Sequence, residues 1–176
     1  DDGEVVVKDG REGFTNVFTS AATNDDFDIQ GHTTMVVSMD VYIAQKPSKE
    51  VFLFSKGVRS DGKHQYYLNY VNTSNLFQLW GEYDSWPNAS KNVTDSFFGK
   101  WHNFVAVYSG GKDELYIDGA KGSRRDKNVN PQHKEFPFII SSAELAEFGG
   151  CIANFKFYNG KYFPNSPLDI SGNNSA

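Results

Sequence analysis

The sequence predicts an all-β protein built from two packed antiparallel sheets. Ten short runs are rich in aromatic and β-branched residues, which favour strands. The connectors between these runs contain Gly, Pro, Asn, Asp and Ser, which are the residues of tight turns. Strands that follow one another without intervening helices pair antiparallel, and two such sheets pack together to bury their apolar faces.

The expected elements follow in chain order. Strands are expected over residues 4–8, 14–20, 33–43, 51–56, 65–71, 76–81, 101–108, 114–117, 136–140 and 150–158. The one helix-like run, residues 141–148, is about two turns long. The sequences Lys-Pro-Ser-Lys, Ser-Asp-Gly-Lys and Asn-Thr-Ser-Asn separate the third to sixth strands, and Asp118-Gly119 predicts a type I′ hairpin turn.

Alternation assigns the faces of the main strands, because successive side chains of a strand point to opposite sides. Residues 104–108 are apolar on both faces, which predicts a central strand. In residues 150–158, Cys151, Ala153, Phe155 and Phe157 are expected to share one buried face. In the strands at 65–71 and 76–81, Leu68, Phe77 and Leu79 are expected to face the core. The opposite face of these two strands carries Tyr67, Asn69, Gln78 and Trp80. Glu82, just after the second strand, continues the same alternation and is expected on this face.

Composition excludes several classes of protein. The chain has 176 residues, and its net charge of −5 argues against a nucleic-acid partner, because phosphate contacts need clustered Lys and Arg. No apolar run approaches the roughly 20 residues that span a bilayer. Cys151 is the one cysteine, which excludes an intrachain disulfide and a zinc–cysteine cluster. We expect a single domain over residues 1–176, with a loose tail at 163–176.

Several runs resemble laminin-G-like, concanavalin A-like sandwich domains. In residues 99–108 a Trp-His pair opens a strand, and residues 114–119 contain Leu-Tyr-Ile-Asp-Gly. Residues 148–159 resemble the closing strand of that family, and residues 33–43 with the Ser-Lys-Gly turn at 55–57 resemble its early core strand. The resemblance covers about residues 14–160 and implies a jelly-roll β-sandwich. Trp101, as a core anchor, and Asp118 are expected to serve the fold.

The resemblance and the residues together favour glycan binding. Aromatic rings stack on the apolar face of a sugar, while amides and carboxylates bond its hydroxyls. The expected ligand-binding residues are Tyr67, Asn69, Gln78, Trp80 and Glu82 on the sheet, and Tyr83 and Trp86 in the loop that follows. The alternative is that Trp80 and Trp86 are packing residues. Arg59 and Arg124 are expected to contribute if the sugar is acidic, because guanidinium groups bind carboxylates.

A bound metal has one candidate site. Asp25, Asp26 and Asp28 gather oxygen ligands of the kind that Ca²⁺ prefers, although a solvated acidic turn has the same sequence. Among the enzymes of this fold, one group of glucan hydrolases uses the pattern Glu-x-Asp-x-x-Glu. Glu82 and Asp84 match its first two positions, but Pro87 replaces the third, so the acid/base partner is missing.

The sequence therefore predicts a non-catalytic lectin-like module that binds glycans, sialylated or not. It would be either a free lectin or part of a larger secreted glycosidase such as a sialidase, with further domains. The alternatives are a laminin-G-type adhesion module that binds proteins, and a glycoside hydrolase or lyase whose active site the sequence does not reveal. Four Asn-x-Ser/Thr sequons lie at Asn72, Asn88, Asn92 and Asn173. If the source is a eukaryote, they favour a secreted or cell-surface location, whereas in a bacterial protein they carry no such meaning.

Overall fold

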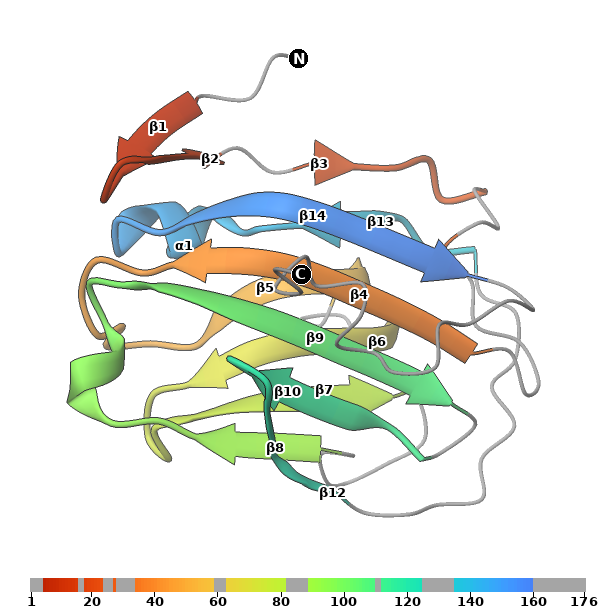
Figure 1. Cartoon of the computed structure of the whole chain (residues 1–176). Coiled ribbons are helices and arrows are strands. Elements are labelled where there is room, and N and C mark those ends of the chain that lie inside the picture. The colour runs from red at the N-terminus through yellow and green to blue at the C-terminus, as the bar shows by residue number, and fades with distance from the viewer. Residues whose placement is uncertain are drawn as a thin grey trace, which may run out of the picture.

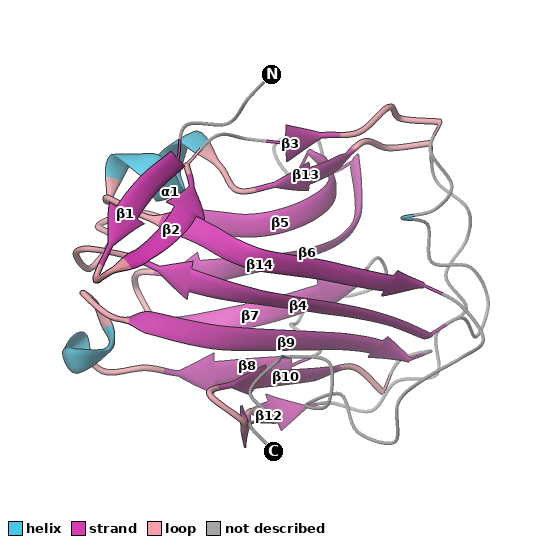
Figure 2. Cartoon of the chain, turned by 45° about the horizontal axis from the view of Figure 1, so that its top comes forward, coloured by secondary structure: helices cyan, strands magenta, loops and turns pink. Residues whose placement is uncertain are grey.

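Two sheets make up the protein, and both are formed by strands from all along the chain. The computed structural model describes residues 5–15, 18–23, 27, 34–58, 63–81, 89–109, 112–124 and 135–159. Within these ranges two seven-stranded antiparallel sheets pack face to face (Figures 1 and 2). This architecture confirms the predicted all-β sandwich.

The sheets are named A and B, and their strands are given in spatial order. Sheet A contains β1 (Val5–Lys8), β2 (Arg11–Phe14), β14 (Cys151–Asn159), β4 (Thr34–Tyr42), β9 (Trp101–Ser109), β10 (Glu114–Ile117) and β11 (Ala120–Lys121). Sheet B contains β12 (Ser123–Arg124), β8 (Ala89–Asn92), β7 (Leu76–Gly81), β6 (Lys63–Val71), β5 (Val51–Val58), β13 (Phe138–Ile140) and β3 (Phe18–Thr19). The described helices are α1 (Ala143–Glu147) and the 3-10 turn η3 (Asp95–Phe97). Neighbours such as β14 and β4 are far apart in sequence, because the chain crosses between sheets as in a jelly roll.

Most predicted strands are present, and two match their predicted bounds, at residues 76–81 and 114–117. The prediction of one strand over residues 14–20 is wrong, because β2 ends at Phe14 and β3 begins at Phe18. Strands β8, β11 and β12 were not predicted. Their sequences are short and polar and show no apolar alternation, so the pattern that identifies a half-buried strand is missing.

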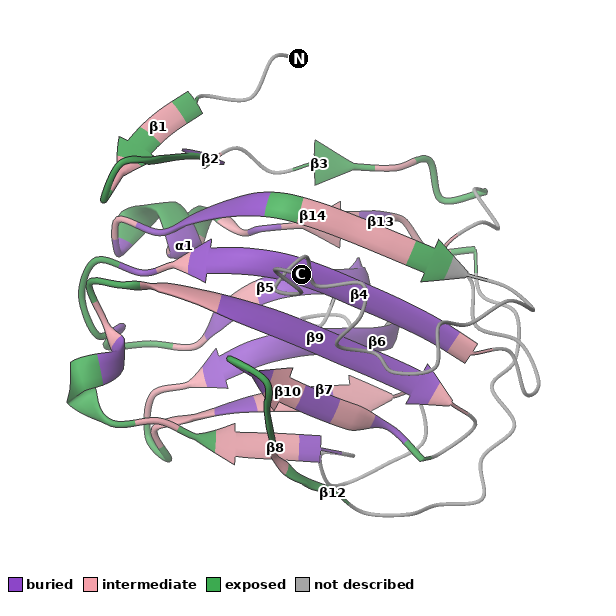
Figure 3. Cartoon of the chain, viewed as in Figure 1, coloured by how far each residue is buried: buried purple, intermediate pink, exposed green. Residues whose placement is uncertain are grey.

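The core lies between the sheets (Figure 3), and nine of its 24 described buried side chains are aromatic. The rings of Phe77 and Phe104 join the two sheets with their centroids 4.8 Å apart, and the rings of Tyr66 and Tyr108 do the same at 4.9 Å. All four side chains are buried. Each buried ring of this size contributes about 1.5–3 kcal/mol relative to an exposed one, so these contacts hold the sheets together.

Strand β9 is central, as predicted, since it lies between β4 and β10 and both of its faces are buried. Its inward side chains include Phe104, and its outward Val105 and Val107 form a second apolar cluster with Val36. The Asp118-Gly119 turn after β10 is also confirmed. Both residues have positive φ, at 51° and 75°, as a type I′ turn requires.

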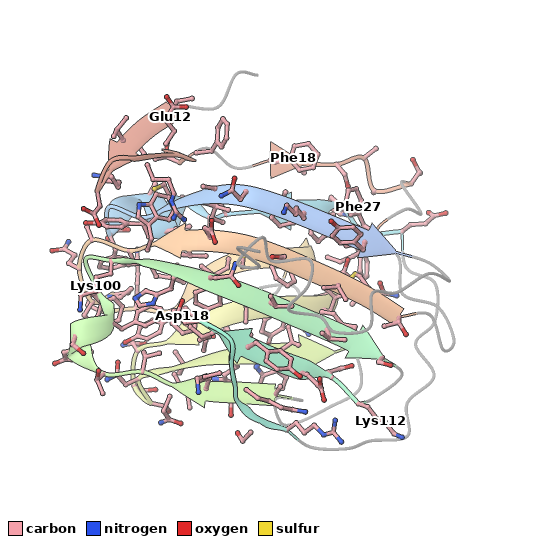
Figure 4. All side chains as sticks on the ribbon, viewed as in Figure 1. Glu12, Phe18, Phe27, Lys100, Lys112 and Asp118 are labelled. Atoms are coloured by element: carbon pink, nitrogen blue, oxygen red, sulfur yellow. The ribbon has the colours of Figure 1, made fainter. Side chains whose placement is uncertain are left out.

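Asp118 does more than form this turn, as its position beside β9 shows (Figure 4). Its Oδ1 accepts the backbone N–H of Asn103 at 2.9 Å, and its Oδ2 lies 2.6 Å from Nδ1 of His102. The His102 ring stacks on Phe97 with the centroids 3.7 Å apart. These contacts fasten the end of β10 to the start of β9, so Asp118 contributes to the fold.

A bulge in β14 changes one predicted face. The pairing with β4 shifts between Ala153 and Lys156, and Asn154 within the bulge has φ of 50°. Before the bulge Ile152 belongs to the core, whereas after it Phe155 packs against the core. The prediction that Cys151 to Phe157 keep one buried face is therefore wrong, because the extra residue of a bulge exchanges the two faces.

Trp101 is not the core anchor that the sequence predicted. It alternates with the inward side chains of β9 and is half-buried on the outer face of sheet A, beneath the β1–β2 hairpin. Its Nε1 donates a 2.6 Å hydrogen bond to the carbonyl of Lys8, and the Arg11 guanidinium lies 5.1 Å from its ring. A Cβ at Gly13 would lie 2.9 Å from Cη2 of the ring, so glycine allows the hairpin to approach. Trp101 holds the hairpin rather than the core.

A buried carboxylate fixes the same hairpin. The side chain of Asp40 is 10% exposed and accepts hydrogen bonds from Arg11 Nη1 at 2.8 Å and Asn103 Nδ2 at 3.0 Å. Asn154 Nδ2, presented by the bulge, adds a third hydrogen bond at 2.7 Å. A buried charge is costly unless it is paired and hydrogen-bonded, and here one ion pair and two amides compensate it.

A second ion cluster joins β10 of sheet A to β12 of sheet B. Glu114 accepts hydrogen bonds from Arg124 Nη1 at 2.7 Å, from the Tyr116 hydroxyl at 2.6 Å and from the Lys121 ammonium. Burial alone would raise the pKa of Glu114, but the hydrogen bonds from Lys121 and Tyr116 and the charges of Lys121 and Arg124 lower that pKa overall. Ionised Glu114 therefore stabilises the folded chain.

The Trp101→Phe variant tests whether Trp101 anchors the hairpin. Loss of the indole N–H leaves the Lys8 carbonyl without this bond, which we expect to cost about 1 kcal/mol of unfolding free energy. Hydrogen exchange should quicken in residues 5–14 and stay unchanged in β4 and β9. Exchange that quickens equally throughout both sheets would contradict this assignment.

The Glu114→Gln variant tests the ion cluster through pH. The folded-state pKa of Glu114 lies below its usual 4.5, so its stabilising contribution is present above that pH and is lost as the pH falls through the folded value. Wild type should unfold at a higher temperature than Glu114→Gln near neutral pH, and the difference should shrink below pH 4.5. A difference that stays constant over this range would show that ionisation of Glu114 does not stabilise the fold.

Candidate functional site

The outer face of sheet B contains the predicted binding residues that the structure describes on β6 and β7. Tyr67 pairs directly with Trp80, and Asn69 pairs with Gln78, so all four side chains leave the same side of the sheet. The intervening Leu68 is buried in the core. The register therefore confirms that these residues share a face. This surface, the Trp80 face, is defined by Phe52, Ser55, Tyr67, Asn69, Leu76, Gln78, Trp80, Ser90, Asn92 and Ser123.

Two of the predicted binding residues are not available to a ligand. Tyr67 is 2% exposed and Asn69 is 1% exposed. The Tyr67 ring is surrounded on the sheet by Phe52, His64 and Trp80, at centroid distances of 5.4, 4.9 and 5.7 Å. The amide of Asn69 donates a hydrogen bond to Glu50. The expectation that Tyr67 offers an exposed ring is wrong, and both residues instead support the surface from within.

Trp80 and Gln78 are the half-exposed members of this group. Nε1 of Trp80 donates a 2.8 Å hydrogen bond to Oε1 of Gln78. This bond uses the N–H of the indole and one of the two lone pairs on the amide oxygen. What remains for a ligand is the apolar ring of Trp80, the amide N–H groups of Gln78 and the second lone pair of its oxygen.

Tyr108 supports the backbone at Trp80 and Tyr67 from the core side of sheet B. Its hydroxyl, which comes from sheet A, lies 3.1 Å from the carbonyl oxygen of Trp80 and 3.3 Å from that of Tyr67. Burial raises the pKa of Tyr108 well above its usual value, so the hydroxyl stays protonated and donates. The backbone beneath Trp80 is thus held by a hydrogen bond through the core.

Hydroxyl groups extend the Trp80 face along strands that sequence reasoning missed. Ser90 pairs with Gln78, and Ser123 pairs with Ser90 in turn. The two serine Oγ atoms lie 3.0 Å apart. The sequence carried no signal for them, because β8 and β12 lack the apolar alternation of the other strands.

Arg124 lies away from the Trp80 face. It pairs with Ala89, whose side chain is in the core, so Arg124 is on the inner side of the sheet edge and bonds Glu114 of sheet A. The prediction that Arg124 binds an acidic sugar on this face is therefore corrected, since its guanidinium already neutralises a carboxylate.

The other predicted site residues lie outside the described residues. They are Arg59, Glu82, Tyr83 and Trp86 of the ligand site and Asp25, Asp26 and Asp28 of the calcium site. The segment 59–62 joins β5 to β6, and 82–88 joins β7 to β8, so both begin at the end of sheet B where Trp80 lies. These residues remain predictions.

In the described part of the chain, no group of three or more His, Cys, Asp or Glu side chains is arranged to hold a metal ion. The helices of this part are also too short to cross a membrane.

Solved structures of other proteins show the same fold. An alginate lyase of polysaccharide lyase family 7, AlgAT5, shares 17% identity with a TM-score of 0.50, over 85% of this chain and 82% of that chain. The carbohydrate-binding module CBM66 from Bacillus subtilis shares 10% identity with a TM-score of 0.50, over 89% of this chain and 91% of that one. A Trypanosoma rangeli sialidase mutant displaying trans-sialidase activity shares 16% identity with a TM-score of 0.56, over 97% of this chain and 28% of the sialidase.

These identities are low enough that the three likenesses establish the fold alone. This chain spans little more than a quarter of the sialidase, whereas it spans most of the lyase and of the binding module. Among curated proteins, no sequence matches this one. The family model described as the concanavalin A-like lectin/glucanases superfamily matches residues 15–165. The chain therefore belongs to the concanavalin A-like lectin/glucanases superfamily.

Proposed function

We propose that this protein is a non-catalytic glycan-binding module and that the Trp80 face binds the sugar. The observation that carries the proposal is the half-exposed Trp80 ring, held rigidly beside the amide of Gln78 and the hydroxyl of Ser90. An apolar ring next to hydrogen-bonding groups matches a sugar, which has a C–H face and a rim of hydroxyls. The fold shared with a bacterial carbohydrate-binding module supports this reading.

The proposed ligand is a neutral sugar chain. Among the side chains that the structure describes on the Trp80 face, none belongs to Lys or Arg, and Arg124 is bonded to Glu114. An acidic sugar needs a cation to compensate its carboxylate. Gln78 and Ser90 suit uncharged hydroxyls instead, because both are uncharged and can donate as well as accept hydrogen bonds, as a sugar hydroxyl does.

We also propose that the module belongs to a secreted or cell-surface protein, on the basis of its four sequons. Its attachment to a larger glycosidase is supported by the sialidase, in which a similar fold forms part of a longer chain.

A protein-binding adhesion module is the second candidate, and exposed apolar side chains favour it. Val5, Val7 and Phe14 are exposed on the β1–β2 hairpin, and Phe18 is exposed on β3 (Figure 4). Such residues are common in protein interfaces. This surface and the Trp80 face are distinct, so mutations separate the two functions.

The Trp80→Ala variant tests the proposed sugar site. A ring stacked on a ligand contributes on the order of 1–3 kcal/mol, with base stacking as the analogue, so affinity should fall about tenfold or more. Isothermal titration with a neutral and a sialylated oligosaccharide measures the loss. Tyr158→Ala is the matched control, because it removes an exposed ring from sheet A and should leave affinity unchanged.

Trp86→Ala should weaken binding to a similar degree if the loop after β7 belongs to the site. Binding that stays at the wild-type level in both tryptophan variants would place the ligand elsewhere. That result would favour the adhesion module.

A second prediction concerns catalysis. The chain should not hydrolyse or cleave glycans, because Pro87 stands where the near-match at Glu82 and Asp84 would need its acid/base carboxylate. Reducing-end and lyase assays with a panel of oligosaccharides measure this. Turnover that disappears in Glu82→Gln would show instead that the protein is an enzyme.

A further inference from the structure

Two of the four sequons, at Asn72 and Asn92, lie in the described residues, and they differ in exposure. Asn92 is exposed at the end of β8, and its side chain makes no hydrogen bond to a described residue. Thr94 is exposed as well, and its backbone is extended, with φ of −104° and ψ of 170°. Both residues that define this sequon are therefore accessible.

Asn72 lies in the turn between β6 and β7 and is half-buried. Its Nδ2 donates a 2.7 Å hydrogen bond to the carbonyl of Ser48 in the connection between β4 and β5. Nδ2 is the atom to which an N-linked sugar attaches, so a glycan here would crowd that connection. The structure therefore favours Asn92 over Asn72 as the acceptor of an N-linked sugar, whereas the sequence motif alone does not distinguish them.

We propose that Asn92 is an N-glycosylation site and that it is modified in preference to Asn72. In the reaction, Nδ2 forms a bond to C1 of the first sugar of a lipid-linked oligosaccharide, and the bond from C1 to the lipid pyrophosphate breaks. One amide proton is lost, and the pyrophosphate leaves with the electron pair. The donor is the lipid pyrophosphate oligosaccharide of a eukaryotic secretory pathway.

The position of Asn92 determines where on the protein surface the glycan would lie. Asn92 pairs with Leu76, which shares its face of β7 with Gln78 and Trp80. Trp80 is four residues further along β7, or about 13 Å at the usual rise of a strand. The oligosaccharide would therefore project from the outer face of sheet B. Its attachment point would be near the Trp80 ring but not directly beside it. The modification itself does not depend on what that face binds.

The experiment is secretion of the full chain from eukaryotic cells behind a signal peptide, followed by glycopeptide mass spectrometry. Treatment with peptide N-glycosidase in ¹⁸O water marks each formerly glycosylated asparagine as ¹⁸O-labelled aspartate. We expect the label at Asn92 in most molecules and at Asn72 in fewer. Because the measurement uses the wild-type chain, it does not depend on the folding of any variant.

Sequon variants provide matched controls. Thr94→Ala and Asn92→Gln should each remove the mass of one glycan, whereas Thr94→Ser keeps the sequon and should retain it. Asn72→Gln should leave the Asn92 glycan in place. An Asn92 peptide without label in the wild type, or higher occupancy at Asn72, would overturn the assignment.

Discussion

The alternation of side chains along the long central strands is the constraint on which the rest of the structure depends. On β4, β6 and β9, every second residue enters the aromatic core between the sheets, and the residue between them faces outward. A slip of one residue in any of these pairings would exchange the two sets and expose the core. Burial of rings such as Phe77 and Phe104 therefore decides which residues reach the outer surfaces.

The proposed binding surface is rigid because the core supports it. The hydroxyl of Tyr108, in sheet A, donates to the backbone carbonyls of Tyr67 and Trp80 in sheet B. The buried Tyr67 ring lies beside Trp80 on the outer face. A preorganised ring loses little conformational entropy when a ligand stacks on it. A residue that cannot touch the ligand, such as Tyr67, still positions the one that can.

Several polar residues that resemble site candidates are used by the fold instead. Asp40 is paired with Arg11 beneath the hairpin, Asp118 fastens β10 to β9, and Arg124 joins the edges of the two sheets through Glu114. Each carries a charge that would suit a ligand or a metal. Their hydrogen bonds within the protein leave the uncharged, half-exposed Trp80 and Gln78 as the better candidates for binding.

The sequence by itself determined the sandwich, most strand positions, the type I′ turn at Asp118 and the shared face of Tyr67, Asn69, Gln78 and Trp80. All of these follow from alternation and turn chemistry, which are local properties of the chain. Only the tertiary structure decided the exposure of each residue on that face, because burial of Tyr67 and Asn69 depends on Phe52, His64 and Glu50 from other positions. The bulge at Asn154 and the position of Trp101 beneath the hairpin were likewise unpredictable, since both depend on contacts between distant strands.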